Sequence, residues 1–540
     1  MDPMLVIAVG SSFIFLLLIG VAFYRKAEKG YLNFLIANKD IPWPVLGFSL
    51  MASMIGASTF FAYPDYVKWT GFGGIYLAMW INTCFILPTM VIAYWGGIGR
   101  LRRGSIFSLF EDRYNVACRM GAAVFVAIFC IAGAGYTMLG VSYVMSLIFG
   151  VGTELGVLIA LAVVLLYCFI SGFYAICWTD FVQQILIMVT LVTIVVVGVI
   201  GVGGWHGIAT NASINPPIHF GWTNALWFSV GLGCAYGLSN FIDPHIWQRV
   251  FAAKNVKAGM RSLSIWMVLT LIFWGLAMFV GLIAIAAFGE TSRYAIFDLS
   301  KKFLPLGFMA ILSAGVLAAV LSSADSHAIA GTTVLGDDFY RRALRPKASD
   351  REYLWVARII TVAILLTATL LAFEYGDILK LAMFAFSIAS AGATIPFLAG
   401  MYWPRANSKG AIAGIVAGGL STLLWEAIMY KPGLTEFPSL FFGLIVCAVF
   451  FFSVTLLTKP EYDKALKIAR ILGLKNTAKR VAEKANLELK EISQEEKELY
   501  GIVEEMTEKE MREAFSPKLM IGLLVCLVLL LLIPLAVIHP

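Results

Sequence analysis

Charged residues are scarce in this chain. Only 14% of its 540 residues are Asp, Glu, Lys or Arg, whereas soluble globular proteins usually have about 25%. Apolar residues make up 60%, and the mean hydropathy is +0.85. A soluble chain of this length would fold as about two to four domains, which cannot bury so much apolar surface. The composition therefore excludes a cytosolic enzyme, a nucleic-acid-binding protein and a disordered protein, and it predicts a membrane protein.

Sequence signals of catalysis and of soft-metal binding are missing as well. The eight cysteines form no Cys-x-x-Cys pair, and most of them lie within apolar runs, as expected of small buried hydrophobic residues. We find no nucleophile–base pair, no cluster of metal-ligand residues and no repeated filter sequence. We therefore expect neither an enzyme nor a channel.

Long apolar runs are what the sequence has instead. A membrane-spanning helix needs roughly 20 mostly apolar residues, and fourteen runs are candidates. They lie at about 4–24, 45–66, 72–97, 118–148, 153–171, 178–202, 222–243, 262–288, 303–335, 353–373, 378–402, 409–428, 438–458 and 518–538. The first run is too long for the core of a signal peptide, so we expect it to be retained.

The distribution of basic residues predicts the orientation in the cell membrane, because Lys and Arg stay on the cytoplasmic side. If residue 1 lies outside, the inward loops before residue 459 hold twenty basic residues and the outward loops hold six. Both termini are therefore predicted to be extracellular or periplasmic. The segment 459–517 is predicted to be a charged cytoplasmic helical hairpin, for which a solvated connector is favoured over a regulatory or docking role.

Some ionisable residues lie inside the apolar runs. Placing such a residue at the bilayer centre costs about 2.5–3.5 kcal/mol, so a functional role is the first explanation to consider. The most informative is Asp325, because Ser322, Asp325 and Ser326 share one face of a helix and Ser323 lies beside them. Hydroxyl, carboxylate and carbonyl oxygens suit a small hard cation. Serines alone would be expected to bond to carbonyls of their own helix, but the added carboxylate favours an ion site.

Two apolar runs contain features that break a helix. Small and hydroxyl residues dominate 48–59, and Gly237 and Pro244 interrupt the segment 236–249. Transporters built from two inverted repeats place one broken helix in each repeat, with the binding site between them. Five spans follow residue 45 and five follow residue 222, which agrees with that architecture. For 48–59 alone, a small-residue face for helix packing is an equal alternative.

Four stretches together resemble the sodium/solute symporter family, which includes proline, pantothenate and sugar carriers. They are Ser171–Gln183, which ends in Thr-Asp-x-x-Gln, Pro244–Arg249, Ala319–Ser326 leading to Asp338-Phe-Tyr340, and Met401–Gly414. The resemblance implies a LeuT-like, all-α fold with two inverted five-helix repeats plus flanking helices. The predicted parts are a leading helix and loop (1–44), the two repeats (45–202 and 203–402), two flanking helices (403–458), the charged segment (459–517) and a last helix (518–540).

The same resemblance implies where ions and solute bind. The main sodium site comprises the carbonyls of Ala52, Ile55 and Ala319 and the hydroxyls of Ser322 and Ser323. A second site, for sodium or a proton, comprises Asp180, Ser322, Asp325 and Ser326. The candidate solute-binding residues are Ser53, Gly56, Ser58, Thr59, Asn240 and Asp243.

The expected function is sodium-coupled symport of a small organic solute by alternating access. An amino acid or organic acid such as proline, a monocarboxylate or pantothenate is favoured over a sugar, because the positions that contact sugar in the family align with Met54, Thr59 and Ala78. Na⁺ is the expected cofactor. The expected partners are the solute and the lipid bilayer, with no nucleic acid and no obligate protein partner. The alternatives are a proton-coupled carrier of the same fold, with Asp180, Asp325 and His327 relaying protons, and a membrane sensor or receptor derived from it.

Overall fold

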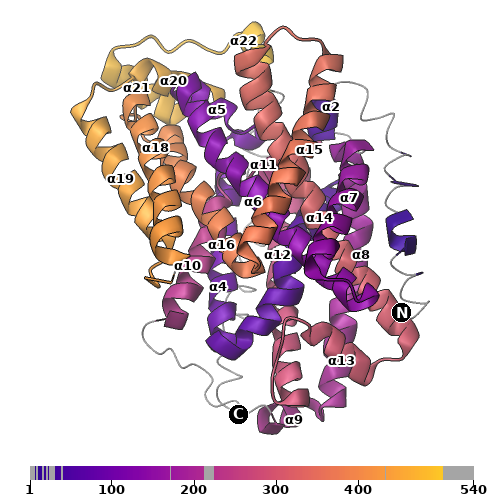
Figure 1. Cartoon of the computed structure of the whole chain (residues 1–540). Coiled ribbons are helices and arrows are strands. Elements are labelled where there is room, and N and C mark those ends of the chain that lie inside the picture. The colour runs from indigo at the N-terminus through magenta and orange to yellow at the C-terminus, as the bar shows by residue number, and fades with distance from the viewer. Residues whose placement is uncertain are drawn as a thin grey trace.

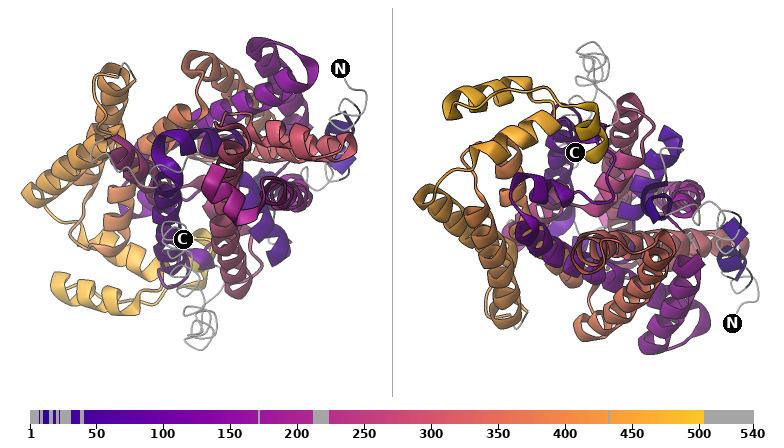
Figure 2. Two further views of the ribbon diagram at one scale, coloured as in Figure 1. Left: turned by 90° about the horizontal axis from the view of Figure 1, so that it is seen from below. Right: turned by 90° about the horizontal axis from the view of Figure 1, so that it is seen from above.

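The protein is described by a computed structural model, in which the described part of the chain is a bundle of helices (Figure 1). Described are residues 31–37, 41–170, 172–211, 224–431 and 433–502, with isolated positions before residue 23. Figure 2 shows the same bundle from both ends, with α18, α19 and the segment that follows them at one side. The first and last predicted spans, 4–24 and 518–538, lie outside these residues apart from a few positions of the first.

The elements follow one another with short connections. They are α2 (Tyr31–Ile36), α3 (Trp43–Met54), η2 (Ser58–Ala62), α4 (Tyr63–Tyr94), η3 (Ile98–Arg100), α5 (Ser108–Arg113), α6 (Val116–Phe149), α7 (Thr153–Ile170), α8 (Phe173–Gly201), α9 (Gly204–Asn211), α10 (Asn224–Ser239), α11 (Pro244–Ala252), α12 (Val256–Phe288), α13 (Ala295–Phe303), α14 (Leu306–Thr333), η4 (Val334–Leu344), α15 (Asp350–Tyr375), α16 (Ile378–Ala389), η5 (Ser390–Thr394), α17 (Ile395–Tyr402), α18 (Ser408–Trp425), η6 (Glu426–Tyr430), α19 (Ser439–Leu457), α20 (Tyr462–Ile471), α21 (Lys475–Ala485) and α22 (Gln494–Leu499).

Local sequence signals set many of the helix ends. The side chains of Asn115, Asn255 and Asn407 each accept a hydrogen bond from a backbone N–H in the first turn of α6, α12 and α18, which satisfies a donor that the helix itself leaves open. Gly150 and Gly289 end α6 and α12 with positive φ, a conformation that costs glycine little.

Nine helices in the described part of the chain are long and apolar enough to cross a membrane, and the bent pair Trp43–Met54 and Ser58–Gly71 makes a tenth span. The predicted spans 153–171 and 222–243 correspond to the shorter helices α7 and α10. All twelve predicted spans between residues 45 and 458 are therefore helical. The total of fourteen and the repeat layout stay predictions.

Packing places α6 and α14 in the middle of the bundle. Helix α6 packs against α14, α15 and α16, α14 also packs against α8, and α4 packs against α10 and α12. Large apolar side chains on outer surfaces stay exposed, among them Ile200, Ile359 and Leu370. Such exposure is expected of surfaces that face lipid, and the protein is a multi-pass membrane protein.

The described part of the charged segment after α19, residues 459–502, packs against the bundle, whereas a solvated connector was favoured above. Helices α20 and α21 form a hairpin with its own small apolar core, and the side chain of Leu472 joins the main core. Lys467 and Arg103 both bond to Asp112 of α5, at 3.0 and 2.6 Å. The hairpin is thus attached to the loop and short helix between α4 and α6, at the upper end of Figure 1.

Three arginines that were counted as basic loop residues in the orientation argument are buried instead. Arg113, Arg119 and Arg249 have at most 7% exposure. Arg119 on α6 pairs with Asp337 and Asp338 of η4 at 3.1 and 2.6 Å. These residues carry charge into the protein interior, so the count overstates the number of basic residues in contact with water.

Candidate functional site

The first predicted break in a helix is present. Helix α3 ends at Met54, the following residue Ile55 has extended backbone angles, and the next helical stretch continues at an angle of 52°. Gly56 lies at this break, and a Cβ there would come within 2.5 Å of the Ser323 hydroxyl. The absence of a side chain at residue 56 thus lets the broken helix approach α14 closely.

The break brings most of the predicted main sodium ligands together. The Ser322 hydroxyl donates hydrogen bonds to the carbonyls of Ala52 and Ala319, both at 3.0 Å. The Ser323 hydroxyl lies 3.4 and 3.3 Å from the same two carbonyl oxygens. Ile55, the fifth predicted ligand, is the residue at the break, and all five residues are buried. This donor set consists only of hard oxygens, which fits an alkali cation.

The four residues of the predicted second site lie on α8 and α14, but a fifth side chain contacts two of them. Asp180 accepts hydrogen bonds from the Ser49 hydroxyl at 2.6 Å and from Arg249 at 3.2 Å. The hydroxyl of Ser326 lies 3.1 Å from the same guanidinium nitrogen. Neither carboxylate oxygen of Asp325 has a hydrogen-bond partner of normal geometry among the described residues.

The six predicted solute-binding residues are buried but do not form one group. Ser53 bonds to Ser326 and Arg249, and Gly56 faces Ser323. Ser58 and Thr59 lie in η2 just after the break, and the Thr59 hydroxyl has no hydrogen-bond partner in the described part of the chain. Thr59 is thus the clearest candidate on this helix to bond a solute.

The other two predicted residues lie at the second break, between α10 and α11. Asn240 donates a hydrogen bond to Asn82 at 3.1 Å. Asp243 caps the start of α11 and lies 2.6 Å from Nδ1 of His245. Asn240 and Oδ1 of Asp243 are therefore engaged at the second break, whereas Oδ2 of Asp243 has no hydrogen-bond partner in the described part of the chain.

Two features of the site were missed at the sequence level. One is Arg249, the single charged residue of α11, which is enclosed by α3, α8 and α14. The other is the contact between His245 and His327, whose ring centroids are 4.5 Å apart. The sequence signal for the first feature was Arg249 itself, a lone charged residue in the short helix that begins at Pro244 and ends at Ala252. The histidine contact joins residues far apart in sequence and left no local signal.

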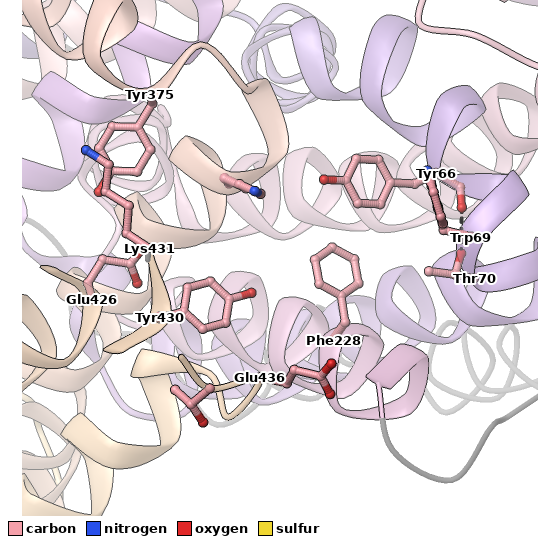
Figure 3. A pocket seen from close by; sticks show the side chains of 11 residues that line it. Tyr66, Trp69, Thr70, Phe228, Tyr375, Glu426, Tyr430, Lys431 and Glu436 are labelled. Atoms are coloured by element: carbon pink, nitrogen blue, oxygen red, sulfur yellow. Dashed lines mark hydrogen bonds between the residues drawn. The ribbon is translucent and has the colours of Figure 1, made fainter. Parts of the chain in front are cut away.

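An aromatic pocket lies between α4, α10 and η6 (Figure 3). Its volume is about 480 Å³. Figure 3 shows the rings of Tyr66, Phe228 and Tyr430 around it. Lys380, Lys431, Glu426 and Glu436 add charges of both signs to its lining, so the pocket suits a polar solute with an apolar part.

A broken helix that meets α14 in a buried set of oxygen donors, within a bundle of membrane-spanning helices, is typical of a secondary transporter. A family model described as the sodium:solute symporter family matches residues 34–418. The chain belongs to this family. It is a sodium-coupled symporter of a small solute, and it is not an enzyme.

Curated relatives in bacteria are similar over most of the chain. The high-affinity proline transporter PutP of Bacillus subtilis is 24% identical, over 81% of this chain and 95% of the relative. The sodium/proline symporter of Escherichia coli is 27% identical, over 81% of this chain and 90% of the relative. The sodium/proline symporter of Haemophilus influenzae is 28% identical, over 63% of this chain and 70% of the relative.

Solved structures agree on the fold. A Na⁺-coupled sialic acid symporter in its substrate-bound outward-open state has a TM-score of 0.71 at 18% identity, and covers 85% of this chain and 99% of its own. A nucleobase-cation-symport-1 family transporter in a closed conformation has a TM-score of 0.52 at 13% identity, and covers 89% and 97%.

Proposed function

We propose that this symporter carries proline, or a small amino or organic acid of similar shape, together with sodium bound between α3 and α14. The observation that carries the proposal is the pair of hydroxyls on Ser322 and Ser323 at the Ala52 carbonyl, because that contact joins the broken helix to α14. Proline is favoured because the curated relatives named above are proline carriers.

The surroundings of the two breaks support a compact solute with an apolar ring. Tyr236 of α10 stacks on Phe386 of α16 with ring centroids 3.9 Å apart, and it meets Trp274 of α12 edge-on. These aromatic side chains give an apolar ring a surface to pack on. The dipole at the start of the helix after the break and the Thr59 hydroxyl, which is unpartnered among the described residues, favour a carboxylate.

Sodium would couple to the solute through the geometry of the break. An ion held by Ala52, Ala319, Ser322 and Ser323 stabilises one position of α3 against α14, and thereby the solute-binding surface beside it. A tenfold sodium gradient and a potential of 100 mV supply about 3.7 kcal/mol per ion, enough for roughly 500-fold accumulation of a neutral solute.

The experiment is uptake of radiolabelled proline into proteoliposomes that contain the full chain. We expect an inward sodium gradient to drive uptake, and an equal potassium gradient not to drive it. The double variant Ser322→Ala and Ser323→Ala should lose the sodium stimulation. Ser313→Ala is the matched control, because Ser313 is also buried on α14 and, within the described residues, its hydroxyl bonds to the Met309 carbonyl of its own helix.

Two outcomes would contradict parts of this proposal. Sodium stimulation that survives in the double serine variant would exclude the predicted main sodium site. Uptake that a proton gradient drives equally well in sodium-free buffer would favour the proton-coupled alternative. If sodium drives no uptake of proline, the same assay with monocarboxylates and pantothenate tests the other favoured solutes.

A further inference from the structure

The two helices of the α20–α21 hairpin differ in the surroundings of their basic side chains. Each basic residue of α20 has a carboxylate partner, with N···O distances of 3.2, 3.0 and 3.1 Å in the pairs Lys464–Glu461, Lys467–Asp112 and Arg470–Glu496. Helix α21 carries four exposed basic residues and one acidic residue, Glu483. Among the described residues only Lys479 pairs with Glu483, at 4.0 Å, and both side chains are more than half exposed. Helix α21 therefore presents an excess of positive charge.

The basic residues of α21 lie mostly on the side that faces away from α20. The apolar side chains of Ala478, Val481 and Ala482 pack onto α20. Because successive residues of an α-helix are rotated by about 100°, three basic residues fall in the opposite half of the helix and the fourth, in the first turn, falls at its edge. We call this side the basic face, and its residues are Lys475, Lys479, Arg480 and Lys484. The Lys484 ammonium also lies 5.6 Å from the centre of the Tyr462 ring. The apolar side of α21 is thus covered, and its charged side is exposed.

The hairpin starts at the membrane surface. Helix α19 is one of the candidate membrane spans, and its last two residues, Leu456 and Leu457, are 57% and 85% exposed, as expected of side chains that face lipid. Only four residues separate α19 from α20, and they can extend over at most about 14 Å. Figure 2 shows the hairpin beside α18 and α19 at one side of the bundle. The hairpin is therefore held close to the lipid headgroups around the bundle.

The headgroups of anionic phospholipids would complement this surface. In the predicted orientation, this end of the bundle faces the cytoplasm, and the cytoplasmic leaflet carries a negative surface potential. Each Lys or Arg close to such a surface strengthens the attraction by roughly fivefold. Phosphate oxygens also accept the charge-assisted hydrogen bonds that Lys and Arg donate. A bilayer with anionic lipid therefore matches the basic face in both charge and position, whereas a soluble acidic partner would match it only in charge.

Contacts between the hairpin and the bundle would transmit such binding to the membrane-spanning helices. Arg100, at the end of η3, donates hydrogen bonds to the carbonyls of Arg470 and Ile471 at 3.2 and 2.8 Å. The carboxylate of Glu461 accepts hydrogen bonds from the backbone N–H and the hydroxyl of Ser408, at the start of α18, at 3.0 and 2.6 Å. The hairpin thus joins the connection between α4 and α6 to the start of α18. A membrane contact that fixes the hairpin would also fix these two segments.

We propose that the basic face of α21 is a docking surface for the headgroups of anionic phospholipids in the cytoplasmic leaflet. The docked hairpin holds the connection between α4 and α6 in place. The inference goes beyond the proposed function, because the basic face lies outside the predicted sodium and solute sites. It presupposes the predicted orientation of the chain but not the identity of the solute.

The test is hydrogen–deuterium exchange of the full chain in nanodiscs, with sodium present and without solute. One bilayer is phosphatidylcholine alone, and the other is a mixture of phosphatidylcholine and phosphatidylglycerol. We expect the backbone amides of α20 and α21 to exchange at least about tenfold more slowly in the mixture. Salt at about 1 M should abolish the difference, since it shortens the range of electrostatic attraction to about 3 Å.

Three variants test which side chains are responsible. The variant Lys475→Gln, Lys479→Gln, Arg480→Gln and Lys484→Gln should lose the difference between the two bilayers. The variant Lys475→Arg, Lys479→Arg and Lys484→Arg keeps the charge and should keep the difference. The matched control neutralises four exposed basic residues in other loops on the same predicted side and should also keep it; its substitutions are Lys254→Gln, Lys257→Gln, Arg345→Gln and Lys347→Gln. All these side chains are exposed, and thermal unfolding in phosphatidylcholine nanodiscs checks that each variant is folded.

Several outcomes would overturn the inference. One is equal exchange of the unsubstituted chain in the two bilayers. Another is a difference that survives in the glutamine variant or that the matched control also loses, because the basic face would then not be responsible. If the glutamine variant exchanges faster by the same factor in both bilayers, the partner is the acidic segment 504–513 of the chain itself and not lipid. Sodium-driven uptake of proline tests the proposed function separately, and its failure would not change these outcomes.

Discussion

Replacing Gly56 by alanine should damage the sodium site without removing any of its ligands. The added Cβ would lie 2.5 Å from the Ser323 hydroxyl oxygen and 2.9 Å from Ser323 Cβ, both closer than non-bonded atoms approach. The hydroxyl can rotate away, but Cβ of Ser323 cannot move without its helix. We therefore expect Gly56→Ala to turn the Ser323 hydroxyl from the Ala52 carbonyl and to widen the gap between α3 and α14.

The size of the effect follows from the packing. Adding a methyl group to a tightly packed interior costs about 1–3 kcal/mol. If that cost falls on the sodium-bound arrangement, it weakens sodium affinity by about 5- to 150-fold, since 1.4 kcal/mol is a factor of ten. Sodium affinity is measured as the sodium concentration that gives half-maximal ²²Na⁺ binding or half-maximal solute uptake.

A matched glycine separates this effect from a general loss of stability. At Gly275 in α12 a Cβ would meet no atom within 4 Å, and alanine there should leave sodium affinity unchanged while favouring the helix slightly. If Gly56→Ala is folded and binds sodium as tightly as Gly275→Ala, then the close approach of residue 56 to Ser323 does not shape the site, and the reasoning fails.

Two further predictions concern the charged side chains away from the site. Arg119→Ala leaves the fully buried Asp338 without a charged partner and should lower the free energy of unfolding by about 3–5 kcal/mol. Arg342→Ala removes a side chain that is 43% exposed and pairs with Glu111, and it should cost about 1 kcal/mol or less. Similar thermal shifts for the two variants would contradict this reasoning. Burial raises the pKa of Glu461, but hydrogen bonds from Ser408 and the nearby Lys464 lower this pKa overall. The ionised Glu461 side chain therefore stabilises the fold above its unfolded pKa, and this stabilisation is lost as the pH falls through the folded pKa. Glu461→Gln should therefore flatten the fall of the thermal midpoint below about pH 4.5, and an unchanged slope would contradict the assignment.

Local sequence patterns were sufficient for the spans and for the parts of the site that lie on one helix. Ser322, Asp325 and Ser326 are spaced to share one face of α14, and this spacing together with the carboxylate favoured a cation site. The break near Ile55 and the break before Pro244 were also visible, because small residues and proline interrupt apolar runs. Each of these signals lies within about a dozen residues of sequence.

The contacts that join distant segments were not predictable in the same way. Arg249 was counted as a loop residue because its neighbours in sequence are loop-like, and only packing places it between α3, α8 and α14. The sequence also did not show that Asn240 and Asp243 have hydrogen-bond partners of their own, and their role in solute binding stays a prediction. The charged segment after α19 was expected in solvent, yet Lys467 and Arg103 share Asp112.

The sequence by itself determined that this protein is a helical membrane transporter, because apolar run length, charge placement and broken helices are local properties that the bilayer makes decisive. It also indicated the oxygens of a predicted cation site. Only the tertiary structure decided which charges meet: a buried carboxylate takes whichever partner the fold brings within reach, and here that partner is an arginine from another helix. The energy of such an ion pair depends on the distance between the two groups and on their burial, and neither quantity follows from the local sequence.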